Sequence, residues 1–134
     1  MNPTSILETC LCVDDLEVAE KFYREVVGLE FYAKVQGRHC FFRCGRTMLL
    51  LFNPEATHSP PGSPIPGHGT QGAGHVAFKM TNSEIEERRD QLKSANVEIE
   101  SEYEWPGGGF SIYFRDPAGN CLEFVTPETW KFSD

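Results

Sequence analysis

The sequence has few of the features that mark membrane, secreted or nucleic-acid-binding proteins. Its apolar runs all stop well short of the roughly 20 residues that span a bilayer, and the first five residues lack the basic and apolar segments of a secretion signal. The five cysteines are odd in number and have no Cys-x-x-Cys spacing, which argues against a disulfide framework and a zinc knuckle. We therefore expect a cytoplasmic protein with reduced thiols.

Basic residues are also scarce. The chain has 12 Lys and Arg against 20 Asp and Glu, which gives a net charge of −8. Nucleic acids and anionic membranes are bound through clustered cations, and the cations here are dispersed. The composition is otherwise that of a globular protein, with 40% hydrophobic residues in 134. A small molecule is thus the expected ligand, with no nucleic-acid or membrane partner.

The segment from Phe114 to Phe124 predicts a β-hairpin that carries an unusual carboxylate. Asp116–Gly119 has the composition of a tight turn between strands at 110–115 and 120–125. Glu123 lies in the middle of the returning apolar strand, where alternate residues share a face. A carboxylate is costly to bury unless another group pairs with it. The sequence therefore predicts a partner for Glu123.

The whole chain predicts two copies of one β-α-β-β-β unit. Each helix begins with a capping pair, Asp14 with Glu17 and Ser83 with Glu86. The strands expected outside the hairpin are Ile6–Val13, Leu29–Val35, Cys40–Arg43, Thr47–Phe52, His75–Met80 and Val97–Tyr103. The prediction is an α+β fold in one domain, 1–134, whose two pseudo-symmetric βαβββ modules form a half-open, barrel-like cleft. The expected parts are module 1 at about 5–54, a linker or lid at 55–73, module 2 at about 74–127 and a tail at 128–134.

The internal repeat brings four strand positions into correspondence. The last strand of each half has the same pattern, so Glu123 corresponds to Leu50, and His75 corresponds to Glu8 within one residue. One imidazole and two carboxylates suit a divalent ion such as Mn²⁺, Fe²⁺, Zn²⁺ or Ni²⁺. Taken singly, each residue also has an ordinary role, as a half-buried histidine or a solvated carboxylate. Their symmetry-related places favour a shared metal site formed by Glu8, His75 and Glu123.

The chain resembles the vicinal oxygen chelate superfamily, which includes glyoxalase I, fosfomycin-resistance thiol transferases, extradiol dioxygenases and bleomycin-resistance proteins. The resemblance extends from about Ile6 to Pro127. The motifs that carry it are Val13–Glu17, Phe22–Arg24, Gly28-Leu29, Gly74–Phe78, Phe114–Asn120 and Leu122-Glu123. It implies the fold of paired modules described above.

The resemblance assigns the superfamily's metal ligands to Glu8, Leu50, His75 and Glu123. His75 and Glu123 are the residues usual at their positions, whereas Leu50 cannot bind a metal and Glu8 replaces what is most often His. The remaining pattern is similar to the three-ligand sets of the fosfomycin-resistance and extradiol enzymes. The additional carboxylate shifts the metal preference toward Mn²⁺ or Mg²⁺.

For function, the resemblance implies a metalloprotein acting on a small oxygen-rich metabolite or xenobiotic, by lyase or isomerase, dioxygenase or thiol-transferase chemistry. Glu123 would be the catalytic carboxylate, and the metal would chelate substrate oxygens. A homodimer is expected, and the ligands come either from one chain or from two subunits. The competing hypothesis is a non-catalytic binding protein of the bleomycin-resistance type, so the sequence leaves open whether the chain is an enzyme.

Six further residues are candidate substrate contacts. The aromatic ones flank the 107–109 glycine turn and can wall a pocket, although aromatic strand residues are more often core. His68 belongs to the loop that leads to His75, and Arg115 suits an anionic substrate. The full set is Leu50, His68, Tyr103, Trp105, Phe110 and Arg115.

Overall fold

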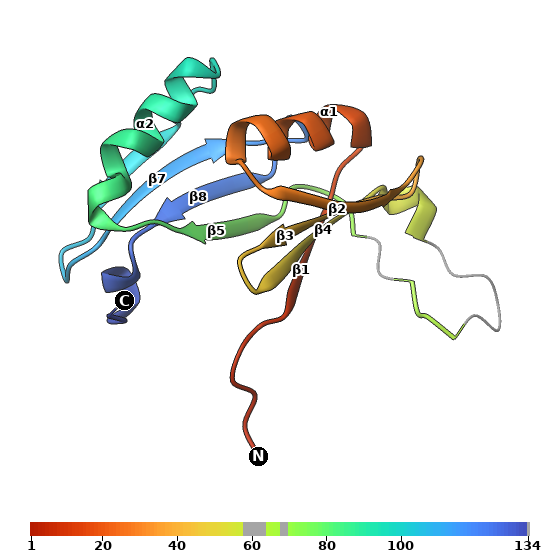
Figure 1. The fold of residues 1–134 in the computed structure, drawn as a ribbon, viewed down its shortest axis with the longest axis horizontal. Coiled ribbons are helices and arrows are strands. Elements are labelled where there is room, and N and C mark those ends of the chain that lie inside the picture. Colours follow the sequence, from red (N-terminus) through yellow and green to blue (C-terminus); the bar gives the residue numbers. More distant parts are fainter. Residues whose placement is uncertain (58–63, 68–69, 134) are drawn as a thin grey trace. The chain divides into compact units, whose positions relative to one another are not determined.

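The computed structural model describes residues 1–57, 64–67 and 70–133, and it contains two compact units, Met1–Gly74 and His75–Asp134. Each unit is a four-stranded mixed sheet with a helix packed on it (Figure 1). The α+β class and the two βαβββ units are therefore confirmed. Within the described residues, no helix has the length and apolarity needed to cross a membrane.

In the first unit the strand order is β1-β4-β3-β2, with β1 parallel to β4. Its elements are β1 (Glu8–Cys12), α1 (Leu16–Phe22) continuing as a π-helical turn (Tyr23–Val27), β2 (Glu30–Val35), β3 (His39–Cys44), β4 (Thr47–Phe52) and a 3-10 turn (Pro54–Thr57). Tyr23 of the helical segment and Phe42 of β3 are both fully buried, with ring centroids 5.9 Å apart. This apolar contact joins the helix to its sheet.

In the second unit the order is β5-β8-β7-β6, with β5 parallel to β8. Its elements are β5 (His75–Lys79), a 3-10 turn (Asn82–Glu84), α2 (Ile85–Ser94), β6 (Ser101–Glu104), β7 (Phe110–Arg115), β8 (Cys121–Val125) and a 3-10 turn (Pro127–Trp130). Figure 1 shows α2 beside β7 and β8, and the Arg88 guanidinium of α2 lies 4.6 Å from the Phe124 ring centroid. Residues that alternate with Phe124, including Glu123, therefore point to the other face of the sheet.

The helix starts differ from the predicted ones by one or two residues. The N-cap of α1 is Asp15, whose Oδ1 accepts from the Val18 backbone N–H at 3.1 Å, whereas Asp14 accepts from the Asp15 backbone N–H. The second capping box is formed by Thr81 with Glu84, in front of a 3-10 turn that precedes α2. At the second helix the capping-box spacing fits both Thr81–Glu84 and Ser83–Glu86, so it cannot select between them, whereas Asp15 caps α1 with Val18 three residues later and forms no capping box.

The strand predicted at Val97–Tyr103 is also shorter, because β6 covers only Ser101–Glu104. Ser101 pairs with Tyr113, and β7 ends two residues later at Arg115, where the hairpin turn begins. In this register Ile99 would lie opposite Arg115, so Val97 and Glu98 of the predicted strand run past the end of β7.

Candidate functional site

The hairpin turn fixes which residues face Glu123. Asp116 is buried, and its Oδ1 accepts from the backbone N–H groups of Ala118 and Asn120 at 2.9 and 2.8 Å. These bonds set an antiparallel register in which Tyr113 lies opposite Glu123. Ser111 follows two residues away, on the same face of the sheet.

His75 reaches the same face from the neighbouring parallel strand β5. Its Nδ1 lies 2.8 Å from the Cys121 carbonyl oxygen, which can only accept, so Nδ1 carries a hydrogen. In the neutral imidazole, Nε2 then presents a lone pair, and it lies 3.4 Å from Glu123 Oε1. The His75 side chain is 50% exposed and that of Glu123 only 9%. The pair therefore has one open side.

The second oxygen of Glu123 is held by buried donors. Ser111 Oγ donates to Glu123 Oε2 at 2.7 Å, and Trp105 Nε1 donates to Ser111 Oγ at 2.9 Å. Burial raises the pKa of the Tyr113 phenol; its Ser111 hydrogen bond opposes this rise, and the Glu123 charge adds to it. Tyr113 thus keeps its proton at neutral pH beside the carboxylate.

The donor pair fits a divalent ion. A separation of 3.4 Å is too long for a good N–H···O bond. It matches the separation of two ligands each about 2.1 Å from a tetrahedral ion, which is roughly 3.4 Å. The outward hydrogen bonds of His75 and Glu123 are of the kind that orient metal ligands. No group of three or more metal-binding side chains occurs within residues 1–57, 64–67 and 70–133, so the structure contains two of the three predicted ligands as a pair.

Glu8 and Leu50 belong to the first unit. Glu8 is exposed at the start of β1, and Leu50 is buried in β4. In the first unit Cys10 of β1 pairs with Leu50, and Glu8 lies two residues before Cys10. In the second unit Ala77 of β5 pairs with Glu123, and His75 lies two residues before Ala77. The strand registers thus give the same correspondence as the sequence repeat. The role of Glu8 as a ligand stays a prediction.

The predicted aromatic contacts lie on two different faces of the second sheet. Tyr103 pairs with Ser111 and therefore shares the face of Glu123, and its ring packs edge-on against Trp105 at a centroid distance of 4.7 Å. Phe110 is on the opposite face, where the Arg89 guanidinium lies 5.3 Å from its ring centroid. Tyr103 and Trp105 are therefore near the His75–Glu123 pair, and Phe110 packs under α2.

Of the two remaining candidates, only Arg115 lies within the described residues, and its printed contacts are not with the pair. Arg115 forms an ion pair with Glu100 at 3.2 Å and donates to the Gly119 carbonyl at 3.1 Å, so its guanidinium is already engaged. His68 lies outside the described residues.

Sequence reasoning missed Ser111 and Tyr113. Both alternate along the strand predicted at 110–115, and a four-residue turn at 116–119 implies the register that sets Tyr113 opposite Glu123. Extending the hairpin inference across the turn would have found them. The hydrogen bond from Trp105 to Ser111 has no comparable signal in the sequence.

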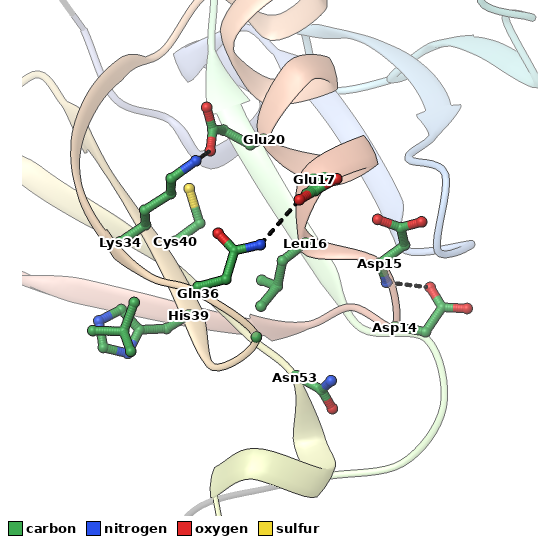
Figure 2. Close-up of a pocket in the computed structure, with 12 residues that line it drawn as sticks. Asp14, Asp15, Leu16, Glu17, Glu20, Lys34, Gln36, His39, Cys40 and Asn53 are labelled. Carbon is green, nitrogen blue, oxygen red and sulfur yellow. Dashed lines mark hydrogen bonds and ion pairs between the residues drawn. The ribbon is translucent and has the colours of Figure 1, made fainter.

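The first unit contains a separate pocket of about 220 Å³ beside the start of α1 (Figure 2). None of the predicted site residues lines it. Figure 2 shows its polar side chains turned toward one another: Lys34 donates to Glu20 at 2.9 Å, and Gln36 donates to Glu17 at 3.0 Å. The Lys34 hydrogen bond holds the pKa of Glu20 below its usual value. These groups satisfy each other, so the pocket has a structural explanation.

The two βαβββ units have the fold of the vicinal oxygen chelate type. The chain belongs to the Glyoxalase/Bleomycin resistance protein/Dioxygenase superfamily, whose profile matches residues 5–124.

Three similar proteins illustrate the match to this superfamily. A lactoylglutathione lyase structure from Agrobacterium tumefaciens is 42% identical, with a TM-score of 0.94, and the match covers 98% of this chain and 100% of that one. Glutathione transferase FosA of Serratia marcescens is 29% identical over 89% of this chain and 78% of its own length. The fosfomycin resistance protein FosX of Listeria monocytogenes is 20% identical, with a TM-score of 0.69 over 93% of this chain and 94% of that one, which shows the shared fold alone.

Proposed function

We propose that this protein is a metal-dependent enzyme in which His75 and Glu123 bind one divalent ion, with Glu8 as a third ligand. The observation that carries the proposal is the 3.4 Å separation of His75 Nε2 and Glu123 Oε1, which matches two ligands on one tetrahedral ion. With a neutral imidazole, these two atoms repel unless a cation lies between them. Because the Cys121 carbonyl takes the Nδ1 hydrogen, the imidazole cannot relieve this repulsion by changing tautomer.

The chain's own groups supply orientation and proton donors. Ser111 and the Cys121 carbonyl hold the two ligands in place. Tyr113, protonated at neutral pH, can donate a hydrogen bond to a substrate oxygen beside Glu123. When bound, the ion would supply Lewis acidity toward substrate oxygens. Charge that develops on such an oxygen during reaction would be stabilised by these donors.

The substrate class that we propose is a glutathione-linked or glutathione-consuming one. Two of the relatives above 25% identity, those at 42% and 29%, carry glutathione in their names. Lyase or isomerase and thiol-transferase reactions are thus favoured over dioxygenase chemistry. We further propose a cytoplasmic homodimer, since superfamily members are often dimers.

The test is metal binding followed by turnover. Untagged protein is titrated with Mn²⁺, Zn²⁺, Fe²⁺ and Ni²⁺ while melting temperature is recorded, and it is then assayed with glutathione plus a 2-oxoaldehyde and with glutathione plus fosfomycin. We expect at least one ion to raise the melting temperature in the wild type and in Glu98→Gln, which removes an exposed carboxylate, but not in Glu123→Ala. Failure of every ion overturns the proposal. Metal binding without any turnover would instead support the binding-protein alternative.

A further inference from the structure

We propose that Trp105 is a positioning residue, which acts through Ser111 to orient the Glu123 carboxylate toward the metal. The inference rests on the proposed metal site and adds to it a residue that has no ligand atom of its own. Trp105 is half-buried, and Ser111 and Glu123 are buried, so water competes little for the bonds between them.

The direction of each hydrogen bond follows from the chemistry of its atoms. An indole Nε1 can only donate, and a carboxylate accepts, whereas a serine hydroxyl has one hydrogen and two lone pairs. Trp105 therefore donates to Ser111 at 2.9 Å, and Ser111 passes its hydrogen to Glu123 Oε2 at 2.7 Å. Hydrogen bonds aligned in this way polarise and strengthen one another.

Ser111 links the indole to one oxygen of the carboxylate. The Trp105 N–H occupies one lone pair of Ser111 Oγ, and the serine hydrogen goes to Glu123 Oε2. Oε2 is then engaged, and Oε1 is left facing His75 Nε2. The relay thus selects which carboxylate oxygen is available to the ion.

The indole is itself held in place from two sides. The Trp105 backbone N–H donates to the Gly109 carbonyl at 3.0 Å, and the Trp105 carbonyl accepts from Gly108 at 2.9 Å. The ring packs against Tyr103. A donor fixed by both backbone and ring contacts suits a positioning role, because orienting it costs little further conformational entropy.

The experiment uses a Trp130→Phe background, which removes the exposed second tryptophan, 72% accessible, and leaves Trp105 as the one fluorophore of its kind. Indole fluorescence is followed during Mn²⁺ titration of the background protein, and Mn²⁺ affinity is measured by titration calorimetry in every variant, because Trp105→Phe in this background has no tryptophan. We expect the fluorescence to change with occupancy, and Ser111→Ala to weaken Mn²⁺ binding by about 10- to 100-fold. Trp105→Phe keeps an aromatic ring and loses one hydrogen bond, so we expect it to weaken Mn²⁺ binding by about 3- to 10-fold.

Two controls separate positioning from general damage. Tyr103→Phe keeps the ring contact with Trp105 and should bind Mn²⁺ within about twofold of the background. Ser111→Thr restores the hydroxyl but adds a buried methyl group, so it should recover affinity over Ser111→Ala even where its melting temperature is lower.

The outcomes distinguish the relay from the metal site. Absence of Mn²⁺, Zn²⁺, Fe²⁺ and Ni²⁺ binding in the background protein refutes the metal site itself. If the background binds metal and folded Trp105→Phe and Ser111→Ala match it within twofold, the site stands and the relay is refuted. Affinity that follows melting temperature across the variants, with Thr no better than Ala at position 111, also refutes the relay.

Discussion

Replacement of Glu123 by Gln should stabilise the metal-free protein while it abolishes metal binding. The carboxamide has nearly the shape of the carboxylate, its oxygen can accept from Ser111, and its NH₂ group can donate to the His75 Nε2 lone pair. One neutral hydrogen bond contributes about 1 kcal/mol net. With an unfolding entropy of about 280 cal/mol/K for 134 residues, this corresponds to a melting temperature about 4 °C higher.

The loss of a charged ligand should at the same time weaken Mn²⁺ binding at least about 100-fold. The assay is differential scanning calorimetry at pH 8 with EDTA, followed by Mn²⁺ titration calorimetry. Glu98→Gln, which removes an exposed carboxylate, should change neither quantity. A melting temperature that falls by several degrees in Glu123→Gln would show that His75 and Glu123 already share a proton, and the argument from opposed lone pairs would be refuted.

Three other results are expected. Glu8→Gln should weaken Mn²⁺ binding about 10-fold or more by titration calorimetry, and unchanged affinity would remove Glu8 from the ligand set. Gly109→Ala should lower the free energy of unfolding, measured in urea, by about 3 kcal/mol, because the new Cβ would lie 2.6 Å from the Thr129 nitrogen. Gly108 has a similar φ of 104° but open space around it, so Gly108→Ala should lower the free energy of unfolding by about 1 kcal/mol. Equal losses in the two variants would contradict the steric argument. Burial raises the pKa of the Cys40 thiol to about 11, so about 0.1% of it is thiolate at pH 8. Mass spectrometry should therefore show Cys40 alkylated more slowly than the exposed Cys10. Alkylation of Cys40 as fast as Cys10 would be the contrary result.

The elements that could be predicted from the sequence are those whose signals are local. The strand 47–52 and the hairpin strand 110–115 have the bounds predicted, because turn residues and apolar runs delimit them. Asn96 follows α2 with φ 57°, a left-handed conformation that asparagine tolerates better than most residues. Helix starts and the edge strand were less accurate, because they depend on competing caps and on where the neighbouring strand ends.

The candidate site divides in the same way. His75 and Glu123 could be paired from sequence because both lie on strands whose alternation is clear, and adjacent parallel strands bring matching faces together. The tautomer of His75 and the chain from Trp105 through Ser111 could not be predicted. They depend on distances between groups on three strands and a turn, which no sequence period encodes.

The strand registers also explain why the first unit has no equivalent of the Glu123 site among its described residues. Leu50 holds the place of Glu123, Phe41 that of Tyr113, and His39 that of Ser111. His39 stacks on Phe41 with ring centroids 4.0 Å apart, and its Nδ1 lies 2.6 Å from Arg38 Nη1. Burial, followed by the Arg38 charge, lowers the pKa of His39, so its neutral ring accepts from Arg38.

A carboxylate at position 50 would therefore lie beside the Phe41 ring. His39, which holds the place of Ser111, would already be hydrogen-bonded to Arg38. Burying such a charge without a donor costs several kcal/mol. Leucine at this position is thus consistent with the loss of the surrounding donors rather than with a single lost ligand. The residues around Leu50 differ from those around Glu123 at each of these places. The buried donors that hold Glu123 are therefore as much a part of the proposed site as the metal ligands themselves.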